Sequence, residues 1–377
     1  MLGSGLVIGN HGGYGRFMER VRNWLRRQVG NPQVVSLVII FVFIATVLYL
    51  AGNSLAPAIA ALVLAYLLDG LVGRLRRMGI PRGISIHAVY LIFVTTLLFA
   101  VFRLLPMLFR QLTQLAQQFP SILAKAKEVL MALPARYPDA VSEAAVSQFM
   151  SGLTAEIGNM GQILVSYSLS SVLTLFAVIV YLILVPLLVY FMIKDKRQIL
   201  TWLSRFLPED RQLTSTVWVE VNKQIGNYVR GKFAEILIVG FVSVVVFKLI
   251  GLQYALLLGA LTGLSVLIPY IGAAAITLPV ALVAFAQWGF NSDFYAAIIA
   301  YLIIQALDGN LLAPLLFSEA VDLHPVAIIV AILFFGGVWG FWGLFFAIPL
   351  ATVIQAVIQA WPGEDVNASF LPDSGSA

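Results

Sequence analysis

The sequence predicts an all-α protein that crosses a membrane several times. Sixty per cent of its 377 residues are hydrophobic and only 11% are charged, whereas about 25% of the residues of an ordinary soluble domain carry charge. Mean hydropathy is +0.95. The apolar residues gather in runs of about 17 to 30, long enough to cross roughly 30 Å of hydrocarbon as helices. We expect about six full transmembrane helices, two interrupted hairpins and amphipathic surface helices.

The first 106 residues are predicted to hold a basic lead-in and three spans. Residues 1–33 contain five arginines and one glutamate, and the region 34–106 follows with apolar stretches at 34–50, 55–72 and 86–106. The first two stretches are joined by Ala-Gly-Asn-Ser, which predicts a helical hairpin. A second basic cluster follows this hairpin. The positive-inside rule then places the N-terminus and both clusters in the cytoplasm.

The middle of the chain alternates between surface segments and a span. Residues 107–161 place apolar side chains at helical spacing opposite polar ones, which predicts an extracytoplasmic insertion of amphipathic helices. Residues 162–193 form one long transmembrane helix, which is interrupted by Pro186. Residues 194–232 carry eight basic and four acidic side chains and are predicted to form a cytoplasmic amphipathic segment.

The region 233–360 is predicted to be the transport region, with two broken apolar runs. The run 254–288 is interrupted at 268–272, and the run 326–360 is interrupted by four glycines and a proline. Each half of the first run covers roughly 22 to 26 Å as a helix, less than a full crossing. Re-entrant hairpins and pairs of spans both remain open. Residues 361–377 form a polar tail that we expect to be disordered and, like the N-terminus, cytoplasmic.

Asp308 is the first candidate functional residue because it lies inside an apolar span. A carboxylate in hydrocarbon costs several kcal/mol unless it faces a partner or a polar cavity, so it marks a functional site by default. Gln305, Asn310 and Pro314 surround it in sequence and are predicted to complete a polar site for substrate or ion. The alternative is a structural cap, in which the carboxylate binds backbone N–H groups where Gly309 loosens the helix.

Four further residues are candidates for binding substrate or ion. Glu235 stands at the inner end of a predicted span, where it either pairs with Lys232 at the interface or takes part in ion coupling. Pro269, Tyr270 and Gly272 form the break of the first interrupted run. That break is either a tip that contacts substrate or a simple interruption between helices. Interrupted segments in the second half of a membrane chain are a pointer to a transporter site.

Several other classes of function are disfavoured by what the sequence lacks. The three histidines are far apart, no cysteine is present, and neither a phosphate-binding loop nor a GxSxG motif occurs. An intramembrane aspartyl protease needs two facing carboxylates, and the sequence places only Asp308 deep in a span. We therefore expect neither enzymatic activity nor a cofactor or metal. We also expect no nucleic-acid binding, because no basic face with base-reading partners is seen.

Five ordered motifs resemble one family of membrane proteins. They are YFMIKDK at 190–196, QIGNYVRGK at 224–232, LIPYIG at 267–272, LDGNLLAPLLFSEAVDLHP at 307–325 and GGVWGFWGLFFAIPLA at 336–351. Together they resemble the autoinducer-2 exporter family of permeases, with the last two closest to its PerM-type subgroup. The resemblance extends from about residue 20 to residue 362.

This resemblance implies a multi-pass transporter of the bacterial inner membrane. Its members export the signalling molecule autoinducer-2 or exchange sodium for protons. The resemblance also implies a homo-oligomer, with a pentamer suspected, and an elevator-like movement of the hairpins. The expected partners are therefore the lipid bilayer, a small solute, and H⁺ or Na⁺. The composition leaves two rivals open, a passive oligomeric channel and a membrane scaffold that transports nothing.

Overall fold

The computed structural model describes residues 32–131, 147–148, 151–152, 171–206, 212–269, 271–317 and 323–360, and these contain helices and no β-strand. The prediction of an all-α polytopic membrane protein is confirmed. The α-helices are α2 (Pro32–Arg77), α3 (Arg82–Phe99), α4 (Leu105–Met131), α7 (Ser171–Lys194), α8 (Lys196–Leu203), α9 (Gln212–Ile250), α10 (Ala255–Ser265), α11 (Ile271–Trp288), α12 (Ser292–Leu307), α13 (Ala313–Phe317) and α14 (Pro325–Ala360). A 3₁₀-helix, η2 (Ser204–Phe206), and two π-helices, η1 (Ala100–Leu104) and η3 (Asp308–Leu312), complete them.

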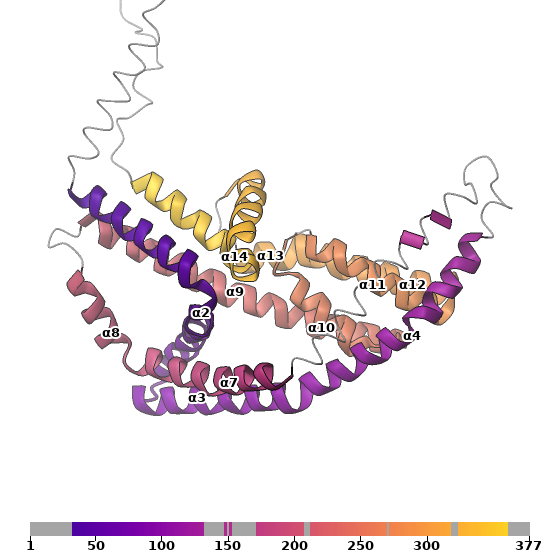
Figure 1. Cartoon of the computed structure of the whole chain (residues 1–377). Helices are drawn as coiled ribbons and strands as arrows, with labels where there is room; N and C mark the ends of the chain where they lie inside the picture. Colours follow the sequence, from indigo (N-terminus) through magenta and orange to yellow (C-terminus); the bar gives the residue numbers. More distant parts are fainter. Residues whose placement is uncertain are drawn as a thin grey trace, which may run out of the picture.

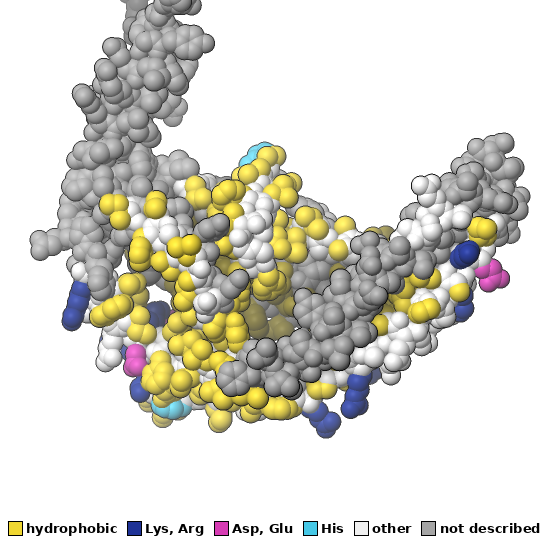
Figure 2. Space-filling view, viewed as in Figure 1, with side chains coloured by type: hydrophobic (Ala, Val, Ile, Leu, Met, Phe, Trp, Pro, Cys, Tyr) yellow, Lys and Arg dark blue, Asp and Glu magenta, His cyan; other side chains and the backbone are white. Residues whose placement is uncertain are grey.

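The helices form a curved array in which α3 and α7 follow one edge and α14 stands over the middle (Figure 1). By length and composition, six stretches of the described residues can each cross a membrane. Hydrophobic side chains cover much of the surface seen in Figure 2, and most of the Lys and Arg side chains lie toward its edges. Two of the six, Ile271–Trp288 and Val326–Gln355, belong to the predicted interrupted runs, so the six stretches are not the six predicted full spans.

The predicted hairpin at 34–72 is wrong, because α2 is one helix of 46 residues. At 1.5 Å per residue α2 is about 69 Å long, more than twice the hydrocarbon thickness. It contains Pro57, a common cause of bends, and it changes direction along its length in Figure 1. Gly, Asn and Ser lower helix propensity but do not end a helix whose backbone groups have no water to bind. Within α2, the stretch Ser54–Arg77 is long and apolar enough to cross a membrane. The orientation of the N-terminus stays a prediction.

Two other predicted boundaries fall inside continuous helices. The limit at residue 106 lies within a helical stretch that runs from α3 through η1 into α4. The limit at residue 232 lies within α9, which has 39 residues. In both places polar side chains suggest a surface segment, whereas the backbone continues as a helix; at residue 232 one face of that helix packs on neighbouring helices. Most of the predicted insertion after residue 131 lies outside the described residues.

A sharp bend separates α7 from α8. The two helices meet at Asp195 and are inclined by 80° to each other. A helix turned this far from a spanning helix lies near the plane of the membrane. The surface position of the start of the predicted cytoplasmic segment 194–232 stays a prediction, while the end of this segment belongs to α9.

The first interrupted run folds back on itself as a helical hairpin. With 11 residues, α10 is about 16 Å long and too short to cross hydrocarbon. A Cβ added to Gly272 would lie only 1.8 Å from the carbonyl oxygen of Ser265, so α10 and α11 touch directly beside the break. Only glycine permits this approach. The two helices form a hairpin in which α10 is too short to span, whereas α11 is long and apolar enough to do so.

The second interrupted run, α14, is also a hairpin. Its backbone leaves helical geometry at Gly340, with φ 56° and ψ −130°, a conformation that only glycine adopts readily. Gly343 lies against the carbonyl of Phe335, and Gly336 lies against Leu344. Residues eight apart lie about 12 Å apart in a straight helix, so these contacts require the chain to reverse. Residues 325–339 and 341–360 are its two arms.

The buried side chains form two separate groups of helices. One apolar core is built from α2, α3 and α7. Three others are built from α4 and the helices from α9 to α14. The two groups meet where Tyr228 and Val229 of α9 pack with Val63 and Leu67 of α2.

Candidate functional site

The site is centred on a buried ion pair within α9. The Nζ atom of Lys232 lies 2.6 Å from Oε2 of Glu235, and the two side chains are only 5% and 4% exposed. Residues three apart share a helix face, which permits this contact. Removing both charges from water costs several kcal/mol per ion, so such a pair is not explained by stability alone.

Asp308 brings a second carboxylate to this pair from η3. Its carboxyl group lies within hydrogen-bonding reach of that of Glu235, and its charge interacts with Lys232. Its Oδ1 atom is buried and has no hydrogen-bond partner among the described residues. No backbone N–H of the described residues binds this atom, so Oδ1 does not act as the structural cap that the sequence leaves open as an alternative. A π-helix inside an α-helix often marks a functional site, and η3 begins at Asp308.

The three side chains form what we call the Lys232 cluster: Lys232, Glu235 and Asp308. With both carboxylates ionised, the cluster holds two negative charges and one positive charge. The cluster therefore reaches neutrality only with one bound proton or one other monovalent cation.

Neighbouring elements pack closely around this cluster. Val266, at the tip of the α10–α11 hairpin, is buried with Val239 and Ile304. Nζ of Lys232 lies 5.3 Å from the centre of the Phe317 ring in α13, a cation–π distance. One turn earlier, the hydroxyl group of Tyr228 donates a hydrogen bond of 3.2 Å to the carbonyl of Phe345 in the α14 hairpin. Both hairpins thus contact α9 near its buried charges.

Three predicted neighbours of Asp308 do not join the cluster. The amide of Gln305 donates to the Tyr301 hydroxyl group over 3.0 Å, and that hydroxyl group donates over 2.5 Å to the carbonyl of Ala273 in α11. Asn310 is exposed and binds the carbonyl of Ala306 in its own helix. Pro314 is exposed on α13. The predicted polar pocket of Asp308, Gln305 and Asn310 is therefore not formed, because helix geometry turns these side chains to different sides.

The predicted hairpin residues have structural contacts near the tip. Gly272 is buried against α10, and Pro269 is half-buried. Ile268, next to Pro269, packs with the core of the α14 hairpin, so the two hairpins touch. Tyr270 lies outside the described residues.

The position of Glu235 corrects the expectation from the sequence that Asp308 is the one carboxylate deep in a span. Glu235 faces Asp308, so two carboxylates meet in the spans where the sequence indicates one. Lys232 distinguishes the arrangement from a simple acid dyad, because it compensates one of the two charges. Among the described residues, no group of three His, Cys, Asp or Glu side chains could hold a metal ion.

Comparisons with known proteins give the cluster its context. The family model described as "AI-2E family transporter" matches residues 18–363. The chain belongs to the AI-2E family. It is 45% identical over 345 residues to "Putative permease PerM" of Escherichia coli strain K12, covering 92% of this chain and 98% of that protein. It is 28% identical over 324 residues to "Putative transport protein YueF" of Bacillus subtilis, with 84% of each chain covered.

A more distant AI-2E relative has a substrate in its name. "AI-2 transport protein TqsA" of Escherichia coli strain K12 is 22% identical over 326 residues, covering 86% of this chain and 90% of that protein. The family as a whole is one of transporters and permeases, so this chain is a multi-pass membrane protein of a transporter family. All members of the Lys232 cluster lie inside the region that matches the AI-2E model.

Lys232 is the member of the Lys232 cluster that the sequence does not single out as a candidate. It ends a segment rich in Lys and Arg, which makes it look like the last cytoplasmic charge. The available signal is its spacing of three residues from Glu235 on one helix face. That spacing indicates a pair, whereas only the packing of η3 and α13 shows that the pair is buried.

Proposed function

We propose that the chain is a secondary transporter of the bacterial inner membrane that moves a small polar solute in exchange for a monovalent cation. The Lys232 cluster is its coupling site, and Asp308 is the carboxylate that takes up and releases the cation. The observation that carries this proposal is that two carboxylates, the buried Glu235 and the half-buried Asp308, share the single ammonium group of Lys232. The experiment described below tests it by removing the Asp308 carboxylate.

Charge balance explains why a cation must move with the solute. A buried, uncompensated charge costs several kcal/mol, so the cluster is stable in the spans only when a proton or a sodium ion is bound. A state in which the cluster is open to water can release that ion, whereas a closed state cannot. Movement between the two sides of the membrane is thereby linked to cation occupancy.

The arrangement of cores supports an elevator-like movement. The core of α2, α3 and α7 shares no residue with the cores of α4 and α9 to α14. The cluster and both hairpins belong to the second group, and the proposed movement against the first requires bending at η1, which joins α3 to α4, and sliding at the contact of α9 with α2. We propose that α2, α3 and α7 are the scaffold, with the end bearing Arg76 and Lys196 in the cytoplasm.

Autoinducer-2 is the first solute to test, because its name is attached to a relative that matches most of this chain. Short hairpins place backbone groups inside the spans, where these groups can bind a small polar solute. This arrangement agrees with export of such a solute. Only 6% of the most apolar part of the helical stretch Arg82–Val129 is buried. We propose that this exposed surface contacts lipid and other copies of the chain in a homo-oligomer.

The test measures solute flux in proteoliposomes under imposed proton or sodium gradients. We expect flux of autoinducer-2 to follow one of the two gradients in the natural protein and to lose that dependence in Asp308→Asn. Asp293→Asn is the matched control, because Asp293 lies exposed on the same helix, outside the cluster. Gradient-dependent flux in Asp308→Asn equal to that of the control would show that the cluster does not couple transport.

A passive oligomeric channel is the rival function that the same vesicles can reveal. A channel would pass solute down its own gradient at a rate that no proton or sodium gradient changes. It would also conduct ions in bulk. The buried surplus carboxylate favours the coupled transporter, because a channel needs no site that alternates between loaded and empty states.

A further inference from the structure

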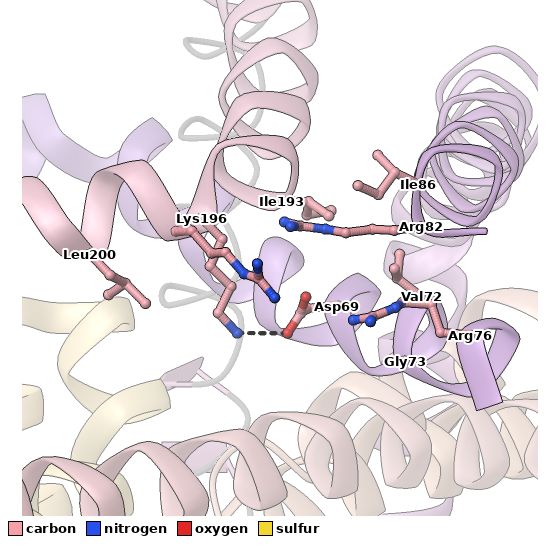
Figure 3. A pocket seen from close by; sticks show the side chains of 10 residues that line it. Asp69, Val72, Gly73, Arg76, Arg82, Ile86, Ile193, Lys196 and Leu200 are labelled. Carbon is pink, nitrogen blue, oxygen red and sulfur yellow. Dashed lines mark hydrogen bonds and ion pairs between the residues drawn. The ribbon is translucent and has the colours of Figure 1, made fainter. Parts of the chain in front are cut away.

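A small cavity lies where α2 ends, α3 begins and α7 bends into α8. Its volume is about 260 Å³. Figure 3 shows charged side chains from these helices converging on the space beside Asp69. The charged lining residues are Asp69, Arg76, Arg82, Lys196 and Arg197. We call this space the basic cavity.

The basic cavity has a surplus of positive charge. Four of its side chains are cationic and one is a carboxylate. Lys196 pairs with Asp69 at 2.8 Å, and Arg82 donates to the carbonyl of Lys194 at 3.3 Å. Within the part of the chain that the structure describes, Arg76 and Arg197 form no ion pair. The cavity thus offers guanidinium groups to an anion and has too few acids to neutralise them.

A larger apolar cavity adjoins the basic one. Its volume is about 870 Å³, and it shares Asp69, Ile193, Lys196 and Leu200 with the basic cavity. Apolar residues of α2 and the tip of the α14 hairpin supply much of its remaining lining. Trp339 and Trp342, at and beside the tip of the α14 hairpin, are part of this lining.

We propose that the two cavities together bind one anionic phospholipid. Its phosphate lies among Arg76, Arg82 and Arg197, where guanidinium groups form paired hydrogen bonds to phosphate oxygens. An acyl chain extends into the larger cavity. The Lys196–Asp69 pair stands at the junction of headgroup and chain.

The surroundings favour a lipid over a free phosphate compound. The bend of 80° lays α8 near the membrane plane, so the basic cavity sits at the depth of the headgroups. Basic pockets between spans on the cytoplasmic side are typical sites for anionic lipids. A free phosphate would fill the basic cavity and leave the adjoining apolar space unused. This site is separate from the Lys232 cluster and does not depend on the transport proposal.

The first measurement is lipid retention by purified full-length protein in native mass spectrometry. We expect phosphatidylglycerol to be retained in preference to phosphatidylcholine. The double variant Arg76→Gln/Arg197→Gln should lower apparent affinity for phosphatidylglycerol by about tenfold or more, because each basic side chain near an anionic lipid contributes a factor of about five. Arg74→Gln/Arg77→Gln is the matched control, since it removes two exposed arginines from the same end of α2.

The second measurement follows the acyl chain. Phosphatidylglycerol brominated on its chains should quench tryptophan fluorescence, because Trp339 and Trp342 line the larger cavity. This quenching should be weaker in Trp339→Phe/Trp342→Phe than in Trp288→Phe, which changes a tryptophan outside that cavity. Quenching equal in the two variants would place the chain elsewhere and overturn the proposal.

Two other results would also contradict a lipid site. Equal loss of phosphatidylglycerol from both arginine double variants would mean that general surface charge holds it. Displacement of the lipid by glycerol 3-phosphate at equal concentration would mean that the site takes a free phosphate compound. The proposal requires that the control keeps its lipid and that the free compound competes poorly.

Discussion

The molecule contains two lysine–carboxylate pairs of nearly equal length in very different surroundings. Lys232 and Glu235 are 2.6 Å apart, with side chains 5% and 4% exposed. Lys196 and Asp69 are 2.8 Å apart, with side chains 44% and 41% exposed. The first pair is joined by another carboxylate, Asp308, and the second by three arginines. The buried site therefore has a surplus of negative charge and the exposed site a surplus of positive charge.

The difference in exposure between the two pairs determines whether the surplus charge beside each pair can bind an ion of opposite sign. At the exposed pair, water and salt screen the charges, so the pair adds little stability, and its surplus arginines remain available to an anion. At the buried pair no water compensates the surplus, so a cation must bind within the cluster itself. Two similar distances thus support an anion site in one place and a cation site in the other.

The largest expected difference between the two pairs is in stability. Lys232→Met should destabilise the protein by about 3–5 kcal/mol, because it leaves the buried carboxylate of Glu235 without its ammonium partner. Lys196→Met should cost no more than about 1 kcal/mol, because its partner remains hydrated. Unfolding in mixed micelles measures both values. Similar losses in the two variants would mean that the burial of Lys232 has no energetic consequence.

A smaller difference is expected in the coupling between partners. A double-mutant cycle with Lys232→Met and Glu235→Gln should give an interaction energy of about 2–3 kcal/mol, whereas Lys196→Met and Asp69→Asn should give less than about 1 kcal/mol. The same unfolding assay applies. An interaction energy near zero for the buried pair would contradict the ion pair on which the coupling site is built.

The smallest difference concerns two glycines. A Cβ added to Gly231, beside the Lys232 cluster, would lie 2.8 Å from the ring of Phe317, whereas one added to Gly73, beside the basic cavity, would meet nothing within 4 Å. Gly231→Ala should cost about 1–3 kcal/mol through overpacking. Gly73→Ala should be neutral or stabilising by up to about 1 kcal/mol, because alanine favours a helix. A neutral Gly231→Ala would show that α13 packs loosely on α9.

Local patterns in the sequence predict much of the fold and one member of the site. Asp308 is found because a carboxylate in an apolar run is unusual, and the two hairpins are found because Gly and Pro interrupt apolar runs. The site around Asp308 cannot be assembled from these patterns. Its partners come from α9, more than 70 residues earlier, and Gln305 and Asn310 turn away although they are near in sequence.

The errors at the boundaries have a common physical cause. Composition marks Gly52, Asn53 and Ser54 as a loop and Lys232 as a surface charge, but composition does not show what packs on the helix. Helical backbone continues through both places. At Lys232 the contacts of α13 and η3 replace the water that the sequence leads one to expect.

The surplus carboxylate of the Lys232 cluster can be observed directly, without knowledge of the solute. Infrared difference spectra of the purified protein, recorded on changing pH or replacing sodium with a larger cation, report carboxyl groups that gain or lose a cation. We expect a carboxyl signal that is present in the natural protein and in Asp293→Asn and is lost in Asp308→Asn. An unchanged difference spectrum in Asp308→Asn would contradict the claim that this carboxylate exchanges a cation.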